Sequence, residues 1–147
     1  MELVTMKIAL LGTGFGQVHA AVYGSRSDVD EVVVFGRTAQ RLAGFAEPFG
    51  FATTTDLEGL VTDASVDLVD ICLPTRLHAE TAVRAMQAGK DVLIELPLAD
   101  TLADAHRIVE VQRETGRRAF VDMFSRFSPS NRHLRKVRRW PISGTDS

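Results

Sequence analysis

Short apolar runs alternate with helical patterns along most of this sequence. The runs are rich in valine, isoleucine, leucine and phenylalanine, as are strands of a parallel sheet covered on both faces. Alternation at this spacing predicts right-handed βαβ crossovers, and therefore an α/β fold with a doubly wound, mostly parallel sheet. The expected strands are Lys7–Leu11, Glu31–Phe35, Gly50–Thr54, Asp67–Leu73, Asp91–Glu95 and Arg118–Met123. The expected helices are Gln17–Ser25, Ala39–Phe49, Leu57–Thr62, Leu77–Ala88 and Leu102–Thr115.

Residues that favour helix ends stand where this alternation requires them. Thr38 can cap the second expected helix, and Asp100 or Thr101 the fifth. Gly89 and Gly116 follow helices at points that favour a positive φ. Apolar stripes at helical spacing predict the buried faces of the last two helices. The stripes are Ala79, Ala82, Val83 and Met86, and then Leu102, Ala105, Ile108, Val109 and Val111.

The composition is that of an ordinary globular protein and excludes several classes. Hydrophobic residues make up 45% and charged residues 24% of 147 residues, with a formal net charge of −2. No global field therefore attracts nucleic acid or an anionic membrane. A single cysteine, Cys72, excludes an internal disulfide framework and a cysteine-cluster metal site. With no apolar run of membrane-spanning length and no secretory signal, we expect a cytoplasmic location and no metal.

A glycine-rich loop follows the first expected strand directly. The segment Gly12-Thr13-Gly14-Phe15-Gly16 joins Lys7–Leu11 to a helical pattern, the context in which such a loop predicts a dinucleotide site in a Rossmann-type sheet of about six strands with helices on both faces. Gly12 permits a tight turn, and Gly14 lets the backbone approach a pyrophosphate at the helix N-terminus. The usual third glycine falls on Gln17, so either the loop is one residue shorter or Gln17 replaces the helix-packing glycine. The alternative is a glycine turn that binds no ligand.

The residues after the second expected strand bear on the choice of cofactor. An NAD-specific site normally has an acidic residue here, whereas this sequence has Gly36-Arg37-Thr38, with Arg41 one turn later. Gly36 leaves space, and a guanidinium at Arg37 can pair with a 2′-phosphate. We therefore expect NADP as the cofactor, with NAD as the second candidate. The alternative is that both arginines are solvated residues at the start of a helix.

Four ordered motifs are similar to one family. They are the glycine loop with Val18-His19-Ala20, the stretch Ile71–His78, the stretch Ala88–Ala99, and Val121–Pro129. In this order, from Ile8 to Pro129, the chain resembles the N-terminal nucleotide-binding domain of the Gfo/Idh/MocA family, which includes glucose–fructose oxidoreductase and inositol dehydrogenase.

The resemblance implies hydride transfer between a nicotinamide cofactor and a sugar or polyol-type substrate. It also implies that the stretch Pro74–His78 lines the nicotinamide side of the pocket and that Glu95 and Pro97 match family residues there. His19 matches a recurrent family histidine, although a plain polar residue on the first helix is an equal alternative. The cofactor-binding residues expected from this second half of the site are Leu73, Pro74, Thr75, His78, Glu95 and Pro97.

The sequence departs from the family pattern at the catalytic position. The family's lysine between Glu95 and the following proline is Leu96 here, which can neither donate a proton nor hydrogen-bond a substrate hydroxyl. Lys90 stands at the wrong end of its strand to replace that lysine. His78 and Arg126 are the remaining polar candidates, so no catalytic residue is assigned, and whether the chain is an enzyme stays open. Two further family positions, an asparagine and a glycine, are Phe124 and Asp122 here.

The expected domain organisation is a nucleotide-binding domain over residues 1–127, followed by a basic segment and tail over 128–147. Family members continue into a second α/β domain that forms the other wall of the substrate pocket, and 128–147 is expected to be its truncated start. Three alternatives follow: an oxidoreductase domain that needs a second polypeptide, a non-catalytic dinucleotide-binding or regulatory module, and a truncated gene product. Uncovered sheet faces favour self-association or a partner that supplies the missing domain.

Overall fold

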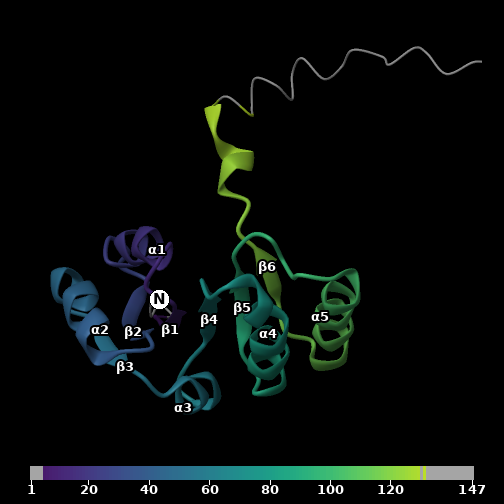
Figure 1. The fold of residues 1–147 in the computed structure, drawn as a ribbon, viewed down its shortest axis with the longest axis horizontal. Coiled ribbons are helices and arrows are strands. Elements are labelled where there is room, and N and C mark those ends of the chain that lie inside the picture. Colours follow the sequence, from purple (N-terminus) through teal and green to yellow (C-terminus); the bar gives the residue numbers. More distant parts are fainter. Residues whose placement is uncertain (1–4, 130, 132–147) are drawn as a thin grey trace, which may run out of the picture.

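The computed structural model describes residues 5–129 and 131 (Figure 1). The strands are β1 Met6–Leu11, β2 Val29–Phe35, β3 Ala52–Thr54, β4 Leu68–Ile71, β5 Asp91–Ile94 and β6 Ala119–Val121. The α-helices are α1 Gly16–Tyr23, α2 Ala39–Ala46, α3 Leu57–Thr62, α4 His78–Gln87 and α5 Leu102–Thr115. Short 3₁₀ helices are η1 Glu47–Phe49, η2 Thr75–Leu77 and η3 Phe124–Phe127. The predicted segment 128–147 lies largely outside the described residues.

All six strands form one parallel sheet in the order β3-β2-β1-β4-β5-β6. The chain winds outward from β1 to β3 and then crosses back to β4, so the order reverses between β1 and β4. Loops that leave neighbouring strands in opposite directions open a crevice at this point, which is where doubly wound folds bind ligands. The predicted fold class is confirmed.

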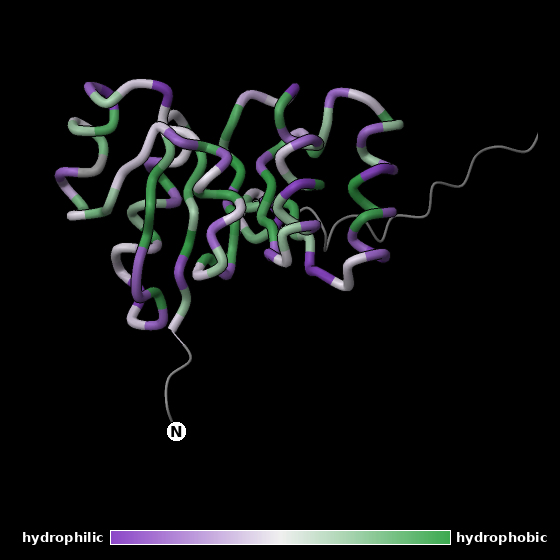
Figure 2. Tube along the Cα trace, turned by 90° about the horizontal axis from the view of Figure 1, so that it is seen from below, coloured by the Kyte–Doolittle hydropathy of each residue, from purple (hydrophilic) through white to green (hydrophobic). Residues whose placement is uncertain are grey.

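Alternate residues of β1 show how the two faces are covered. Ile8 and Leu10 are buried with residues of α1 and α2, whereas Ala9 and Leu11 are buried with residues of α3, α4 and α5. The strand interiors accordingly carry hydrophobic residues in the middle of the molecule (Figure 2). A parallel sheet buried on both faces needs apolar residues at consecutive positions, and this is the pattern of the sequence.

The bounds of α3 and α5 and the start of α2 are those predicted, whereas α1 is shifted toward the N-terminus, α2 ends three residues early and α4 is one residue shorter at each end. The Thr38 hydroxyl accepts a hydrogen bond from the Arg41 backbone N–H at 3.4 Å. At the start of α5 the cap is Thr101, not Asp100, and its hydroxyl oxygen lies 3.0 Å from the Asp104 backbone nitrogen. Gly116 ends this helix with a φ of 68°.

The predicted apolar stripe of α5 is wrong at two positions. Leu102 is 73% exposed and Val109 is 38% exposed, while only Ile108 and Val111 are buried. The reason is position, since α5 packs against α4 and its Leu102 and Val109 are exposed within the described part of the chain. Among the described residues, no helix is long and apolar enough to cross a membrane.

Candidate cofactor site

The carboxyl ends of the strands stop in register and place a row of residues side by side. Leu11 pairs with Ile71, Ile71 with Ile94, and Ile94 with Val121. Each strand therefore ends at the same level, one or more residues earlier than the sequence predicted for β4, β5 and β6. The first residues beyond the strands are Gly12, Gly36, Cys72, Glu95 and Asp122, and these form the floor of the candidate site.

Two positions of the loop require glycine for different reasons. Gly12 has a φ of +111°, and a Cβ there would lie 2.4 Å from the carbonyl oxygen of Cys72. The backbone after β4 therefore comes so close to Gly12 that no side chain fits there. A Cβ at Gly14 would meet nothing within 4 Å. The space above Gly14 is therefore open on the protein side, as close approach of a pyrophosphate to the backbone requires.

Gly16 settles which form of the loop the chain uses. It is the first residue of α1 and is buried, whereas Gln17 is exposed. A Cβ at Gly16 would lie 3.5 Å from Leu10 Cδ1, an ordinary van der Waals distance, so Gly16 faces β1 although the packing does not require a glycine. The buried position at the start of α1 is thus Gly16 and not Gln17, one residue earlier than in the usual fingerprint.

A cleft of about 350 Å³ opens between the loop after β1, the loop after β2 and the loop after β4. Eight of the predicted cofactor residues line it, namely Gly12, Thr13, Gly14, Gly36, Arg37, Arg41, Leu73 and Pro74. Phe35, Leu57, Cys72, Arg76 and Leu77 line it as well. The other predicted residues, Phe15, Gly16, Thr38, Thr75, His78, Glu95 and Pro97, do not line this cleft.

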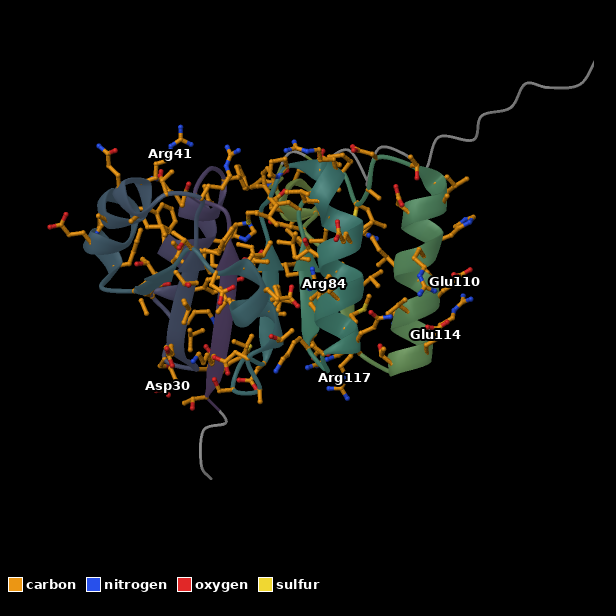
Figure 3. The ribbon with its side chains drawn as sticks, turned by 60° about the horizontal axis from the view of Figure 1, so that its bottom comes forward. Asp30, Arg41, Arg84, Glu110, Glu114 and Arg117 are labelled. Atoms are coloured by element: carbon orange, nitrogen blue, oxygen red, sulfur yellow. The ribbon has the colours of Figure 1, made fainter. Side chains whose placement is uncertain are left out.

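One end of the cleft is basic. Arg37 and Arg41 are exposed, and Arg41 points outward from α2 (Figure 3). Among the described residues that line the cleft there is no aspartate or glutamate. A Cβ at Gly36 would lie 2.8 Å from Leu42 Cδ2 and 3.1 Å from Thr13 Cγ2, so this glycine lets the loops after β1 and β2 touch. The arrangement suits an anionic group beside the β2 end.

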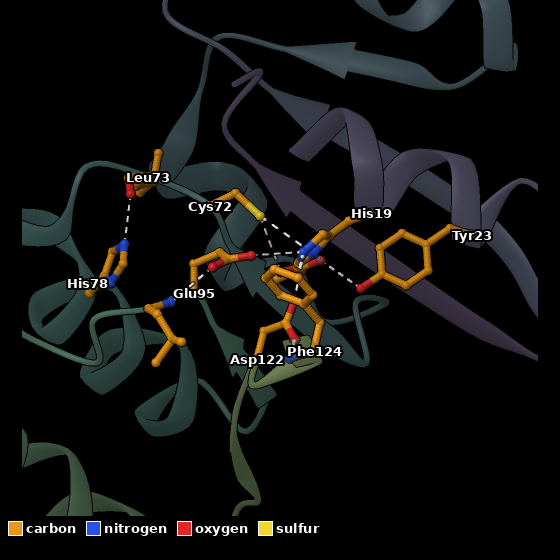
Figure 4. A network of polar contacts seen from close by, with 10 residues as sticks. His19, Tyr23, Cys72, Leu73, His78, Glu95, Asp122 and Phe124 are labelled. Atoms are coloured by element: carbon orange, nitrogen blue, oxygen red, sulfur yellow. Dashed lines mark hydrogen bonds and ion pairs between the residues drawn. The ribbon is translucent and has the colours of Figure 1, made fainter. Parts of the chain in front are cut away.

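Beyond the cleft, His19 is the centre of a polar network that joins α1 to the ends of β4, β5 and β6 (Figure 4). Its Nδ1 lies 2.6 Å from Asp70 Oδ2, and its Nε2 lies 3.0 Å from Glu95 Oε1 and 3.1 Å from Asp122 Oδ2. Tyr23 donates its hydroxyl proton to Asp70 Oδ2 at 2.6 Å. We call these residues, with Cys72, the His19 network.

The surrounding carboxylates favour the charged form of His19. The hydrogen bond to Asp70 raises the pKa of His19 to about 9, with further contributions from the charges of Asp70, Glu95 and Asp122. Burial raises the pKa of Tyr23 and that of Cys72, and the Asp70 charge adds to both shifts. At neutral pH the network therefore holds an imidazolium, a neutral phenol and a neutral thiol.

The same residues offer a poor metal site. His19, Cys72 and Glu95 each place one ligand atom within 4.8 Å of the others. A metal needs a thiolate and a free imidazole lone pair. The raised pKa values of Cys72 and His19 hold both groups in their protonated forms. We therefore assign no metal to this cluster.

His78 has a structural role that its ring contacts define. Its side chain is buried, with Nδ1 2.9 Å from the Pro97 carbonyl oxygen and Nε2 2.7 Å from the Leu73 carbonyl oxygen. Both ring nitrogens thus face backbone acceptors, and the side chain clamps the loops after β4 and β5 together. Neither nitrogen is directed toward a substrate.

The family's catalytic position is solvent-facing in this chain. Leu96 is 49% exposed, and its backbone N–H donates to Glu95 Oε2 at 2.9 Å. Arg126 is exposed on η3, and Lys90 is buried at the opposite end of β5. No described side chain replaces the lysine at this point.

Sequence reasoning missed Asp70, Tyr23 and the central place of His19. A signal for Asp70 was present, because a charged residue between Val69 and Ile71 in a buried strand requires a partner. The partner, fifty-one residues earlier in the chain, becomes visible only when α1 is placed beside β4. Asp122 was noted only as a departure from the family glycine.

Comparison with known proteins agrees with a nucleotide-binding fold and a dinucleotide site at the ends of the strands. A family model described as an oxidoreductase family with an NAD-binding Rossmann fold matches residues 6–123. A 4-carboxy-2-hydroxymuconate-6-semialdehyde dehydrogenase from Sphingobium sp. is 38% identical over 88% of this chain and 42% of its own length. Inositol 2-dehydrogenase 2 from Saccharopolyspora erythraea is 36% identical over 91% of this chain and 41% of its own length.

Solved structures agree. The crystal structure of biliverdin reductase from Synechocystis sp., in complex with biliverdin and NADP+, has a TM-score of 0.83 at 30% identity and covers 89% of this chain and 42% of that one. The chain thus spans about two fifths of the length of the relatives that it matches. It belongs to the Gfo/Idh/MocA oxidoreductase family, and it comprises that family's NAD-binding Rossmann domain.

Proposed function

We propose that this chain is the NADP(H)-binding part of an oxidoreductase that transfers hydride between the nicotinamide and a sugar or polyol-type substrate. The observation that carries the proposal is the cleft whose floor is the glycine loop and whose β2 end bears Arg37 and Arg41. Open space above Gly14 fits the pyrophosphate, so the residues present fit the cofactor.

The charge at the β2 end supports NADP over NAD. A 2′-phosphate needs guanidinium or hydroxyl donors, and a free ribose needs a carboxylate acceptor. Arg37 follows Gly36 directly and lines the cleft together with Arg41. An NAD ribose would find no described carboxylate in the lining of this cleft.

When bound, the cofactor supplies the hydride acceptor or donor, while the chain's own residues bind and orient it. Proton transfer to or from the substrate needs another group, because Leu96 has no ionisable side chain and both ring nitrogens of His78 lie against backbone carbonyl oxygens. We propose that this group comes from the substrate domain that makes up the rest of the relatives' length. The chain alone is then expected to bind cofactor without turnover.

An apolar rim supports the docking of such a domain. Exposed side chains beside the site are Phe15, Leu96, Met123, Phe124 and Phe127, with exposures between 43% and 68%. The rings of Phe15 and Phe124 lie 6.0 Å apart, so the rim joins the glycine loop to η3. We propose that a substrate domain, in the same or another polypeptide, covers this rim. A double variant that carries Phe124→Ser and Phe127→Ser should lose binding to a separately expressed substrate domain of a relative. The assignment would be contradicted if the double variant bound that domain as tightly as the wild type. It would also be contradicted if the wild-type chain bound a second copy of itself through the rim and did not bind the domain.

The cofactor preference is tested by titrating NADPH and NADH into the wild-type chain and two variants. We expect NADPH to bind at least about tenfold more tightly, and Arg37→Ala to weaken NADPH at least about tenfold with little effect on NADH. Arg113→Ala on α5 removes an exposed arginine far from the cleft and serves as the matched control. Tighter binding of NADH by the wild type would refute the NADP preference.

A further inference from the structure

The His19 network has an unusual charge balance for a partly buried cluster. Asp70, Glu95 and Asp122 bring three carboxylates to one imidazolium, which leaves an excess of two negative charges. The Asp70 side chain is fully buried, whereas the Glu95 and Asp122 side chains are 13% and 20% exposed. The uncompensated charge therefore lies on the solvent side of the network, at the carboxyl ends of β5 and β6 and beside the cleft.

No arginine or lysine neutralises this charge within the described part of the chain. The ion pairs of Glu95 and Asp122 are both made with the single Nε2 of His19. The residue after Glu95, where the family has a lysine, is Leu96. The other polar neighbours are uncharged: Tyr23 and Cys72 have raised pKa values, and the backbone N–H groups of Leu96 and Phe124 donate to Glu95 Oε2 and Asp122 Oδ1 at 2.9 Å each.

This negative charge lies on the other side of the sheet's switch point from Arg37 and Arg41. Glu95 and Asp122 follow β5 and β6, and Arg37 follows β2 on the other side of β1 and β4. A dinucleotide crosses the switch point of such a sheet with its phosphates at the helix N-terminus between its two halves. With the adenosine half at the β2 end, the nicotinamide half would lie toward the ends of β4 to β6, where Glu95 and Asp122 are found.

The oxidised nicotinamide ring carries a formal positive charge, and the reduced ring carries none. We propose that the Glu95–Asp122 carboxylate pair makes this domain bind the oxidised cofactor in preference to the reduced cofactor. This inference rests on the proposed function, since it assumes that the cleft holds a nicotinamide dinucleotide. Its consequence is a domain that takes up the oxidised cofactor and releases the reduced cofactor, while the bound oxidised ring becomes a weaker hydride acceptor because the carboxylates stabilise the charge that hydride removes.

The test compares dissociation constants for NADP+ and NADPH in one buffer at pH 7.5 and low salt. Calorimetry gives both constants, and NADPH fluorescence gives an independent value for the reduced form. We expect the wild type to bind NADP+ at least about threefold more tightly than NADPH, because one unit charge several ångströms away in a partly solvated site changes affinity by roughly this factor or more. Asp122→Asn should lower the ratio of the two constants at least about threefold, mainly by weakening NADP+.

Two further variants separate charge from structure. Glu95→Gln removes the other carboxylate and should lower the same ratio. Asp30→Asn removes an exposed carboxylate at the opposite end of the molecule from Arg41 and should leave the ratio unchanged (Figure 3). A ratio that stays the same in Asp122→Asn and Glu95→Gln, or a wild type that prefers NADPH, would overturn this inference. Failure of the wild type to bind either form would instead refute the proposed function.

Discussion

The buried imidazolium of His19 predicts that the fold loses stability as the pH rises through about 9. The pKa of His19 is raised from 6.5 to about 9 by its hydrogen bond to Asp70 and by the neighbouring carboxylates. Because the folded-state pKa lies above the unfolded value, this contribution is fully present below pH 6.5 and is lost as the pH rises through 9. A difference of this size corresponds to at most about 3 kcal/mol of unfolding free energy.

Urea denaturation followed by circular dichroism at pH 6.0, 7.5, 9.0 and 10.0 measures this loss. The wild type should lose about 3 kcal/mol across the series, mostly above pH 7. His19→Gln should be destabilised by about 3–5 kcal/mol at pH 6, because it leaves buried carboxylates without a cation. It should also lose most of the pH dependence between pH 6 and 9, whereas the raised pKa values of Cys72 and Tyr23 leave a further loss toward pH 10 in both proteins. His106→Gln, on the exposed face of α5, is the matched control. A wild-type stability that stays constant from pH 6 to 10, or an unchanged slope in His19→Gln, would refute the reasoning.

Further predictions concern the glycine loop, the thiol and a helix cap. Gly14→Ala should change the unfolding free energy by less than about 0.5 kcal/mol, because its Cβ would meet no protein atom within 4 Å. It should nevertheless weaken NADPH binding at least about tenfold, because the Cβ would occupy the space proposed for the pyrophosphate. Gly12→Ala should cost about 2 kcal/mol or more in the same denaturation assay, since its φ is +111° and its Cβ would meet a carbonyl oxygen. Iodoacetamide at pH 8 should label Cys72 at least about tenfold more slowly in the folded chain than in urea, because the pKa of its thiol is raised; equal rates would contradict the burial. Thr101→Ala should lower stability by about 1 kcal/mol, and Thr101→Ser should restore most of it.

The fold was predictable because local signals and long-range order agree. Apolar strands, caps such as Thr38, and glycines such as Gly116 all belong to the same βαβ plan, and α3 and α5 have the predicted bounds. Strand ends were less predictable. Apolar residues such as Leu73 continue the pattern of a strand although the hydrogen-bonded ladder has ended at Ile71, because periodicity reports burial and not pairing.

The two halves of the site differ in how much the sequence could show. The phosphate end is made of neighbours in the chain, so the spacing of Gly12, Gly14 and Gly16 predicted the loop, with its shortened form as one of two alternatives. The His19 network joins His19 to residues between 4 (Tyr23) and 103 (Asp122) positions away along the chain, and their proximity depends on how α1 lies against the ends of β4, β5 and β6. Only the folded chain shows that His19 and Asp70 form one unit.

The most direct test of the central claim is a heteronuclear NMR titration of the 16.1 kDa chain with NADP+. Cofactor bound as we propose should shift the backbone amide signals of Thr13, Gly14 and Gly16 first, together with those of Arg37 and Glu95. The signals of Asp30 and Gly116, which lie away from the carboxyl ends of the strands, should stay in place. Shifts confined to residues outside the cleft, or no shifts at millimolar NADP+, would contradict the account.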